Sequence, residues 1–71
     1  MRSEIIVNVE RYPIRLGQFL KLADIVQDGL EAKALIAGGD VLVNGDIELR
    51  RGRQLSAEDR ISVAGQSFVC R

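Results

Sequence analysis

The sequence has no histidine and no tryptophan, and its single cysteine is Cys70. Without histidine, the chain lacks the most frequent general base and the most frequent metal ligand of proteins. One cysteine cannot form an intramolecular disulfide or a cysteine zinc site, so we interpret Cys70 as an ordinary strand residue. These absences argue against a hydrolase or a transition-metal enzyme. We therefore expect no metal and no cofactor.

Long apolar runs are also missing. No stretch approaches the length of a membrane span, and no signal peptide opens the chain. With 46% hydrophobic and 28% charged residues, the composition is that of a globular protein. A chain of 71 residues suffices for one small core. We therefore expect a single domain over residues 1–71, monomeric, cytoplasmic and without a membrane partner.

The apolar pattern predicts two short helices near the middle of the chain. Residues 14–26 place Leu16, Phe19, Leu20 and Ala23 on one face at helical spacing. Gly17 is a weak point in this helix, because glycine costs about 1 kcal/mol relative to alanine. Residues 30–39 predict a second helix that ends at paired glycines.

The remaining segments predict strands. Residues 3–10 alternate with period two. Asn44-Gly45, between two alternating segments, is the clearest signal for a two-residue hairpin turn. Two short strands around Gly65-Gln66 close the chain. The sequence thus predicts an α+β fold, with a two-helix motif packed on a small antiparallel sheet of four to five strands.

The formal net charge of zero hides a segregation of charge along the chain. Residues 11–21 hold three basic residues and no acidic one, and residues 50–53 hold three arginines that we interpret as unopposed. The carboxylates collect elsewhere, and those of the hairpin, Glu48 among them, are expected to be solvated. A surface of this kind attracts a polyanion locally, and the planar fork of arginine suits phosphate.

Aromatic residues are scarce, at 4% of the chain. Phe19 and Phe68 fall in apolar patterns, which leaves Tyr12 as the candidate to stack on a nucleobase. Binders of single-stranded nucleic acid use several stacking side chains. Their scarcity favours the recognition of phosphate positions and helix shape, which is how folded RNA is read.

The stretch "RLGQFLKLADIVQDGLEAKALIAGGDVLVNG" resembles the RNA-binding domain called S-four, after the fourth protein of the small ribosomal subunit. The resemblance runs from Arg15 to about Val63, and its marks are "RL", "EAKALI" with its paired glycines, and "VLVNG" in this order. It implies a non-enzymatic module that docks on structured RNA, and it resembles the small stand-alone bacterial kind. Arg15 and Lys33 carry over from the family pattern.

Two positions depart from that pattern. The family commonly has aspartate where this chain has Gly17, and a Ser-Arg pair where it has Asp28-Gly29. Our hypothesis is that the arginines after the hairpin replace the missing one. The predicted face for ribosomal or transfer RNA then consists of Arg15, Gln18, Lys21, Lys33, Arg50, Arg51 and Arg53.

Two other functions are compatible with a chain of this size. A carrier of ubiquitin-like size would end in an exposed Gly-Gly tail, whereas this chain ends in "FVCR" and its Gly38-Gly39 pair is internal. A protein-interaction module that makes no RNA contact is the alternative that the sequence leaves open.

Overall fold

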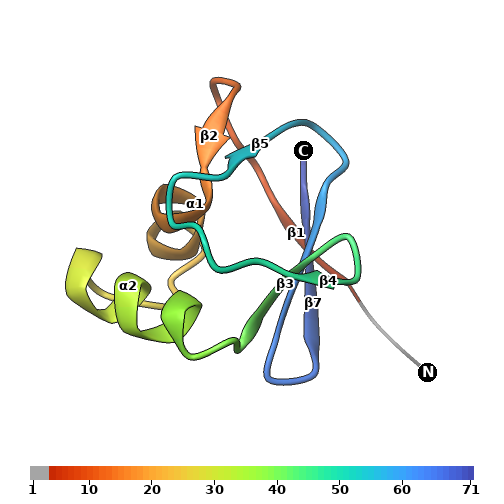
Figure 1. The fold of residues 1–71 in the computed structure, drawn as a ribbon. Helices are drawn as coiled ribbons and strands as arrows, with labels where there is room; N and C mark the ends of the chain where they lie inside the picture. The colour runs from red at the N-terminus through yellow and green to blue at the C-terminus, as the bar shows by residue number, and fades with distance from the viewer. Residues whose placement is uncertain (1–3) are drawn as a thin grey trace.

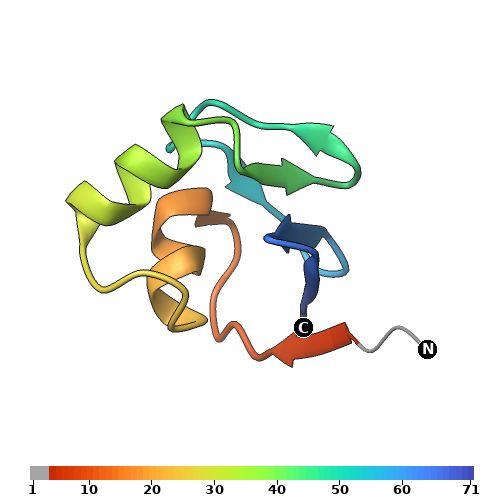
Figure 2. The ribbon, with the colours of Figure 1, turned by 90° about the horizontal axis from the view of Figure 1, so that it is seen from below.

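The computed structural model describes residues 4–71 as two helices packed against one side of a sheet (Figure 1). Figure 2 shows the same two layers from below, with the helices on one side and the strands on the other. In chain order the elements are β1 (Glu4–Val7), β2 (Ile14–Arg15), α1 (Leu16–Leu22), α2 (Gly29–Ala37), β3 (Val41–Val43), β4 (Asp46–Ile47), β5 (Gln54–Leu55), β6 (Arg60–Val63) and β7 (Gln66–Cys70).

The main sheet has the strand order β1-β7-β6-β3-β4. All of its pairings are antiparallel except one, since β1 runs parallel to β7 with Val7 opposite Cys70. The α+β class and the two-helix arrangement are confirmed, and the sheet is mixed rather than wholly antiparallel. Because the chain leaves β1 through the helices and returns to β7 only at its end, the two strands can meet in the same direction.

A second sheet pairs β2 with β5, and sequence reasoning missed both strands. Each has two residues, too few for an alternating pattern to show. Leu55 in β5 is fully buried. This pairing places the segment after the hairpin against the start of α1.

The core lies between the helices and the inner face of the sheet. The predicted stripe of α1 is confirmed, since Leu16, Phe19 and Leu20 are fully buried and Ala23 packs against the same cluster. From α2, Ala32 and Ile36 join it. The burial of these apolar side chains is what fixes the two helices against the sheet.

The hairpin turn at Asn44-Gly45 is confirmed, and both residues have positive φ, 52° and 90°. The second hairpin turns at Ala64-Gly65, one residue before the predicted Gly65-Gln66, because β7 already begins at Gln66. Asn44 also has a role that the turn does not require. Its side chain accepts a hydrogen bond from the Arg60 backbone N–H and donates one to Asp59, which links the first hairpin to β6.

A cationic hollow between the helices and the loop after the hairpin

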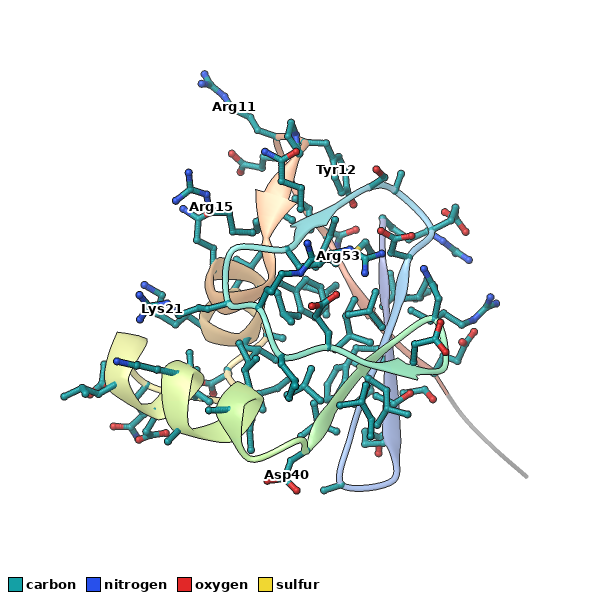
Figure 3. The ribbon with its side chains drawn as sticks, in the orientation of Figure 1. Arg11, Tyr12, Arg15, Lys21, Asp40 and Arg53 are labelled. Atoms are coloured by element: carbon teal, nitrogen blue, oxygen red, sulfur yellow. The ribbon has the colours of Figure 1, made fainter. Side chains whose placement is uncertain are left out.

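Three cationic side chains meet around one hollow of about 330 Å³. Arg15 and Lys21 come from the α1 side and Arg51 comes from the loop after the hairpin. The remaining lining residues are uncharged: Gly17, Gln18, Gly29, Ala32 and Gly52. Figure 3 shows Arg15 and Lys21 on the same side of the molecule. The hollow therefore has a positive rim and small residues on its walls.

The buried stripe of α1 determines which side chains reach the hollow. With Leu16, Phe19 and Leu20 turned into the core, Gln18 and Lys21 face outward. The Gln18 Oε1 accepts a hydrogen bond from the Arg15 backbone N–H at 3.1 Å. This contact satisfies a backbone donor at the start of α1 and holds the Gln18 amide beside Arg15.

The loop of residues 50–53 docks directly on the start of α1. The Leu16 N–H donates to the Arg53 carbonyl at 2.8 Å, and the Gly17 N–H donates to the Arg51 carbonyl at 3.0 Å. These backbone N–H groups at the helix start have no partner within α1, so the loop supplies the acceptors they need. The contact joins two parts of the chain that are more than thirty residues apart in sequence.

Gly17 is the place where the Arg51 side chain lies across α1. A Cβ atom at position 17 would sit 2.7 Å from Arg51 Cγ and 3.3 Å from Arg51 Cδ. No real pair of such atoms approaches so closely, so any other residue at position 17 would displace the arginine. The glycine that costs α1 helix propensity is therefore what lets Arg51 reach the rim of the hollow.

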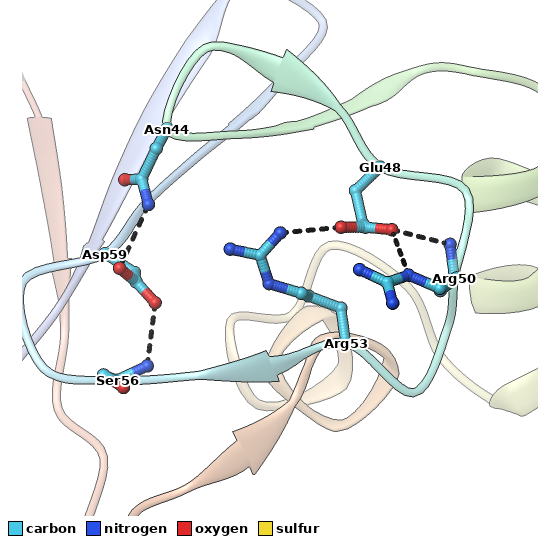
Figure 4. A network of polar contacts seen from close by, with 6 residues as sticks. All are labelled: Asn44, Glu48, Arg50, Arg53, Ser56 and Asp59. Atoms are coloured by element: carbon cyan, nitrogen blue, oxygen red, sulfur yellow. Dashed lines mark hydrogen bonds and ion pairs between the residues drawn. The ribbon is translucent and has the colours of Figure 1, made fainter.

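The interpretation of the loop arginines as unopposed is wrong for two of the three. Glu48, only 8% exposed, lies between two of them (Figure 4). Its Oε1 accepts from Arg53 at 2.7 Å, and its Oε2 accepts from the Arg50 Nε and backbone N–H, both at 3.1 Å. Hydrogen bonds from Arg50, and then from Arg53, lower the pKa of the Glu48 carboxyl to about 2. Glu48 is thus not the solvated acid that was expected.

The sequence-predicted residues therefore fall into two groups. Arg15, Gln18, Lys21 and Arg51 line the hollow. Arg50 and Arg53 pair with Glu48, and Figure 3 shows Arg53 pointing toward the middle of the molecule.

Lys33 is exposed and does not line the hollow, although it follows Gly29 by one turn on the same row of α2.

Asp28, one of the departures from the family pattern, caps α2. Its carboxylate accepts a hydrogen bond from the Glu31 backbone N–H at 2.9 Å, and Glu31 in turn accepts from the Gln27 N–H at 3.3 Å. Aspartate is among the best residues for this position. The acid at the helix corner therefore has a structural role, and Gly29 next to it leaves the hollow open.

Tyr12 does not line the hollow. Its hydroxyl donates a hydrogen bond to the Arg71 carbonyl at 3.0 Å, and its side chain lies toward the end of the chain (Figure 3). Burial of Cys70, at 0% exposure, raises the pKa of its thiol to about 11, which keeps it protonated and unreactive. Cys70 is the strand residue that the sequence predicted.

Within residues 4–71, neither helix is long and apolar enough to cross a membrane. Over the same residues, no three His, Cys, Asp or Glu side chains are grouped so that they could hold a metal ion.

Fold and hollow define the class of this protein: a small α+β binding module with a cationic recess suited to a polyanion. Residues 7–70 match the S4 domain family, and the chain therefore belongs to that family. This confirms the predicted resemblance. S4 domains are RNA-binding modules rather than enzymes, so RNA binding is the general function.

Two individual proteins are similar to this chain. A probable ribosome maturation protein, RlbA of Bacillus subtilis (strain 168), is 42% identical over 59 residues, which cover 83% of each protein. The solution structure of YbcJ from E. coli superposes with a TM-score of 0.71 at 31% identity, covering 99% of this chain and 90% of YbcJ. That structure is described as revealing an ALFAL motif involved in RNA binding.

Proposed function

We propose that this protein binds structured RNA of the ribosomal or transfer class through the cationic hollow, without catalysing a reaction. The observation that carries the proposal is the convergence of Arg15, Lys21 and Arg51 on one recess with glycine walls. Guanidinium groups donate paired hydrogen bonds to phosphate oxygens, and small residues let a nucleic-acid backbone approach closely. The similarity to a probable ribosome maturation protein supports ribosomal RNA as the first candidate.

The other predicted residues extend this face. Gln18 supplies an uncharged polar group between Arg15 and Lys21, and Lys33 adds a cation next to Gly29 on α2. Arg50, whose side chain is 76% exposed beside Glu48, and Arg53 lie at the edge of the face. We place Tyr12 outside the first layer of contacts. The protein acts in the cytoplasm as a monomer with one domain over residues 1–71.

Binding of this kind is electrostatic and falls with salt. If the hollow and Lys33 neutralise three or four phosphates, log K against log salt has a slope of about −2 to −4. The test measures the anisotropy of labelled RNA fragments from bacterial ribosomes with the variants Arg15→Ala, Lys21→Ala and Arg51→Ala. Arg60→Ala is the matched control, because it removes an equal charge at an ion pair with Glu4, away from the hollow.

Each hollow variant is expected to weaken binding by about tenfold and to reduce the slope by about 1, whereas the control changes neither appreciably. Equal affinities for the hollow variants and the control would overturn the proposal. Crosslinking in cells followed by sequencing identifies the RNA. A pull-down that keeps its protein partners after ribonuclease treatment, with no RNA crosslinked, would favour the protein-interaction module instead.

A further inference from the structure

We infer that Glu48 is a positioning residue for RNA binding, because it holds the loop of residues 50–53 so that Arg51 stays on the rim of the hollow. The inference rests on the proposed function of the hollow and concerns an acid that does not line it. Glu48 thus has a role in RNA binding although it is negatively charged. From the charge pattern alone, an acid at this place would be expected to weaken the binding of an anion.

The geometry around Glu48 is that of a clamp. Both carboxylate oxygens are used, one by Arg53 and the other twice by Arg50, so both flanks of Arg51 are tied to a single side chain. Glu48 is itself anchored, since its backbone N–H donates to the Val41 carbonyl at 3.0 Å. The Arg53 N–H also donates to the Arg50 carbonyl at 3.2 Å, which closes the loop into a turn around Arg51.

The other side of the loop faces α1. There the carbonyls of Arg51 and Arg53 accept from Gly17 and Leu16, and the Arg51 side chain lies in the space that Gly17 leaves free. The loop is therefore held from two sides, by Glu48 toward the sheet and by α1 toward the hollow. α1 binds only two carbonyls of the loop, and the charged contacts of Glu48 add the restraint on the side of the sheet.

Two roles for Glu48 predict opposite signs in one experiment. If Glu48 only shields the arginines, Glu48→Gln removes one negative charge, releases Arg50 and Arg53, and tightens RNA binding. If Glu48 positions Arg51, the same change loosens the loop and weakens binding although the protein has become more positive. The isosteric amide keeps the shape of the side chain, which makes the sign of the change informative.

The experiment measures binding of labelled ribosomal RNA fragments near physiological salt, where distant surface charges are screened. Glu48→Gln is expected to weaken binding about fivefold in the wild-type background and to have no further effect in an Arg51→Ala background. Glu58→Gln is the matched control, because it removes the acid of another arginine pair, with Arg71, away from the hollow. Its affinity should equal or slightly exceed that of the wild type.

A second measurement separates loop positioning from loss of fold. In Glu48→Gln, hydrogen exchange of the Gly17 amide should become faster, since this amide is bonded to the loop. The Ala23 amide, which donates to the Phe19 carbonyl at 2.9 Å and not to the loop, should keep its protection. If Glu48→Gln does not fold, Glu48→Asp, too short to reach both arginines at once, is tested in the same way.

The outcomes are distinguishable. Tighter or unchanged binding by Glu48→Gln, or an equal loss in the Arg51→Ala background, overturns the positioning role. If Arg51→Ala itself leaves affinity unchanged, the hollow is not the binding site, and the proposed function fails together with this inference.

Discussion

Two glycines line the same hollow, and their surroundings are opposite. Gly17 on α1 is covered by the Arg51 side chain, 2.7 Å from where its Cβ would stand. At Gly29, the first residue of α2, an added Cβ would meet no atom within 4 Å apart from its chain neighbours and the backbone of its own helix. One wall of the recess is therefore occupied by an arginine from a distant loop, and the other wall is bare.

The difference shows how this chain departs from the pattern of the family it belongs to. The family pattern has a basic side chain on α2, where Gly29 stands here, and an acid where Gly17 stands. In this chain the cation reaches the recess from the loop and lies across α1 instead. Our hypothesis was that the loop arginines replace the family's arginine that is missing at Gly29. Because Arg50 and Arg53 are paired with Glu48, the hypothesis now concerns Arg51 alone.

The largest effect on RNA affinity is expected from a substitution at Gly17, which fills the space that the Arg51 side chain now occupies. Gly17→Ala places a methyl group against Arg51 Cγ, close to the root of the side chain, so the Arg51 side chain must shift and its guanidinium moves with it. We expect RNA affinity to fall about tenfold, as for the loss of one charged hydrogen-bonded contact. Stability changes little, because better helix propensity offsets the crowding.

A double-mutant cycle checks this cause. In the Arg51→Ala background nothing occupies the space, so Gly17→Ala should leave RNA binding unchanged and stabilise the protein by about 1 kcal/mol through helix propensity. Urea unfolding and RNA anisotropy measure the two quantities. An equal loss of affinity in both backgrounds would mean that Arg51 and Gly17 act independently.

At Gly29, on the open wall of the hollow, a larger side chain is expected to raise RNA affinity. Gly29→Arg meets no obstruction and adds a cation to the recess, so we expect affinity to rise about fivefold and the salt slope to steepen by about 1. Gly29→Gln, of similar length but uncharged, is the matched control. Were both variants to bind as the wild type does, the wall formed by α2 would lie outside the RNA footprint.

The sequence predicted the elements whose signals are local. The apolar stripe of α1, the paired glycines after α2 and the turn at Asn44-Gly45 each depend on residues within a few positions of one another, and all three are confirmed. The family resemblance added the order of these elements. Lys21 was predicted from the outward face of α1, and Arg15, in β2 just before that helix, was also part of the family resemblance; both line the hollow.

What the sequence could not predict are contacts between distant segments. The pairing of β2 with β5 involves two residues from each strand, and the space over Gly17 is filled by an arginine thirty-four positions later. Glu48 was expected to be solvated because it follows a hairpin, and no periodicity signals that a loop will fold back over it. The one available hint was an acid two and five positions before the arginines it binds.

The smallest effect we predict is the pH dependence of stability that comes from Glu48, the acid that binds Arg50 and Arg53 of the loop. Glu48 has its pKa lowered from the ordinary 4.5 to about 2 in the folded protein, through its hydrogen bonds with Arg50 and Arg53. The stability that these bonds contribute is therefore fully present above about pH 4.5 and is lost as the pH falls toward 2. Melting temperatures of the wild type should fall across this window more steeply than those of Glu48→Gln, which has no proton to take up.

Glu10→Gln, which removes an exposed acid outside this cluster, should keep the wild-type slope. Parallel curves of melting temperature against pH for the wild type and Glu48→Gln would show that the carboxylate does not stabilise the folded state. Glu48 would then not be the residue that holds the loop of residues 50–53 on the side of the sheet.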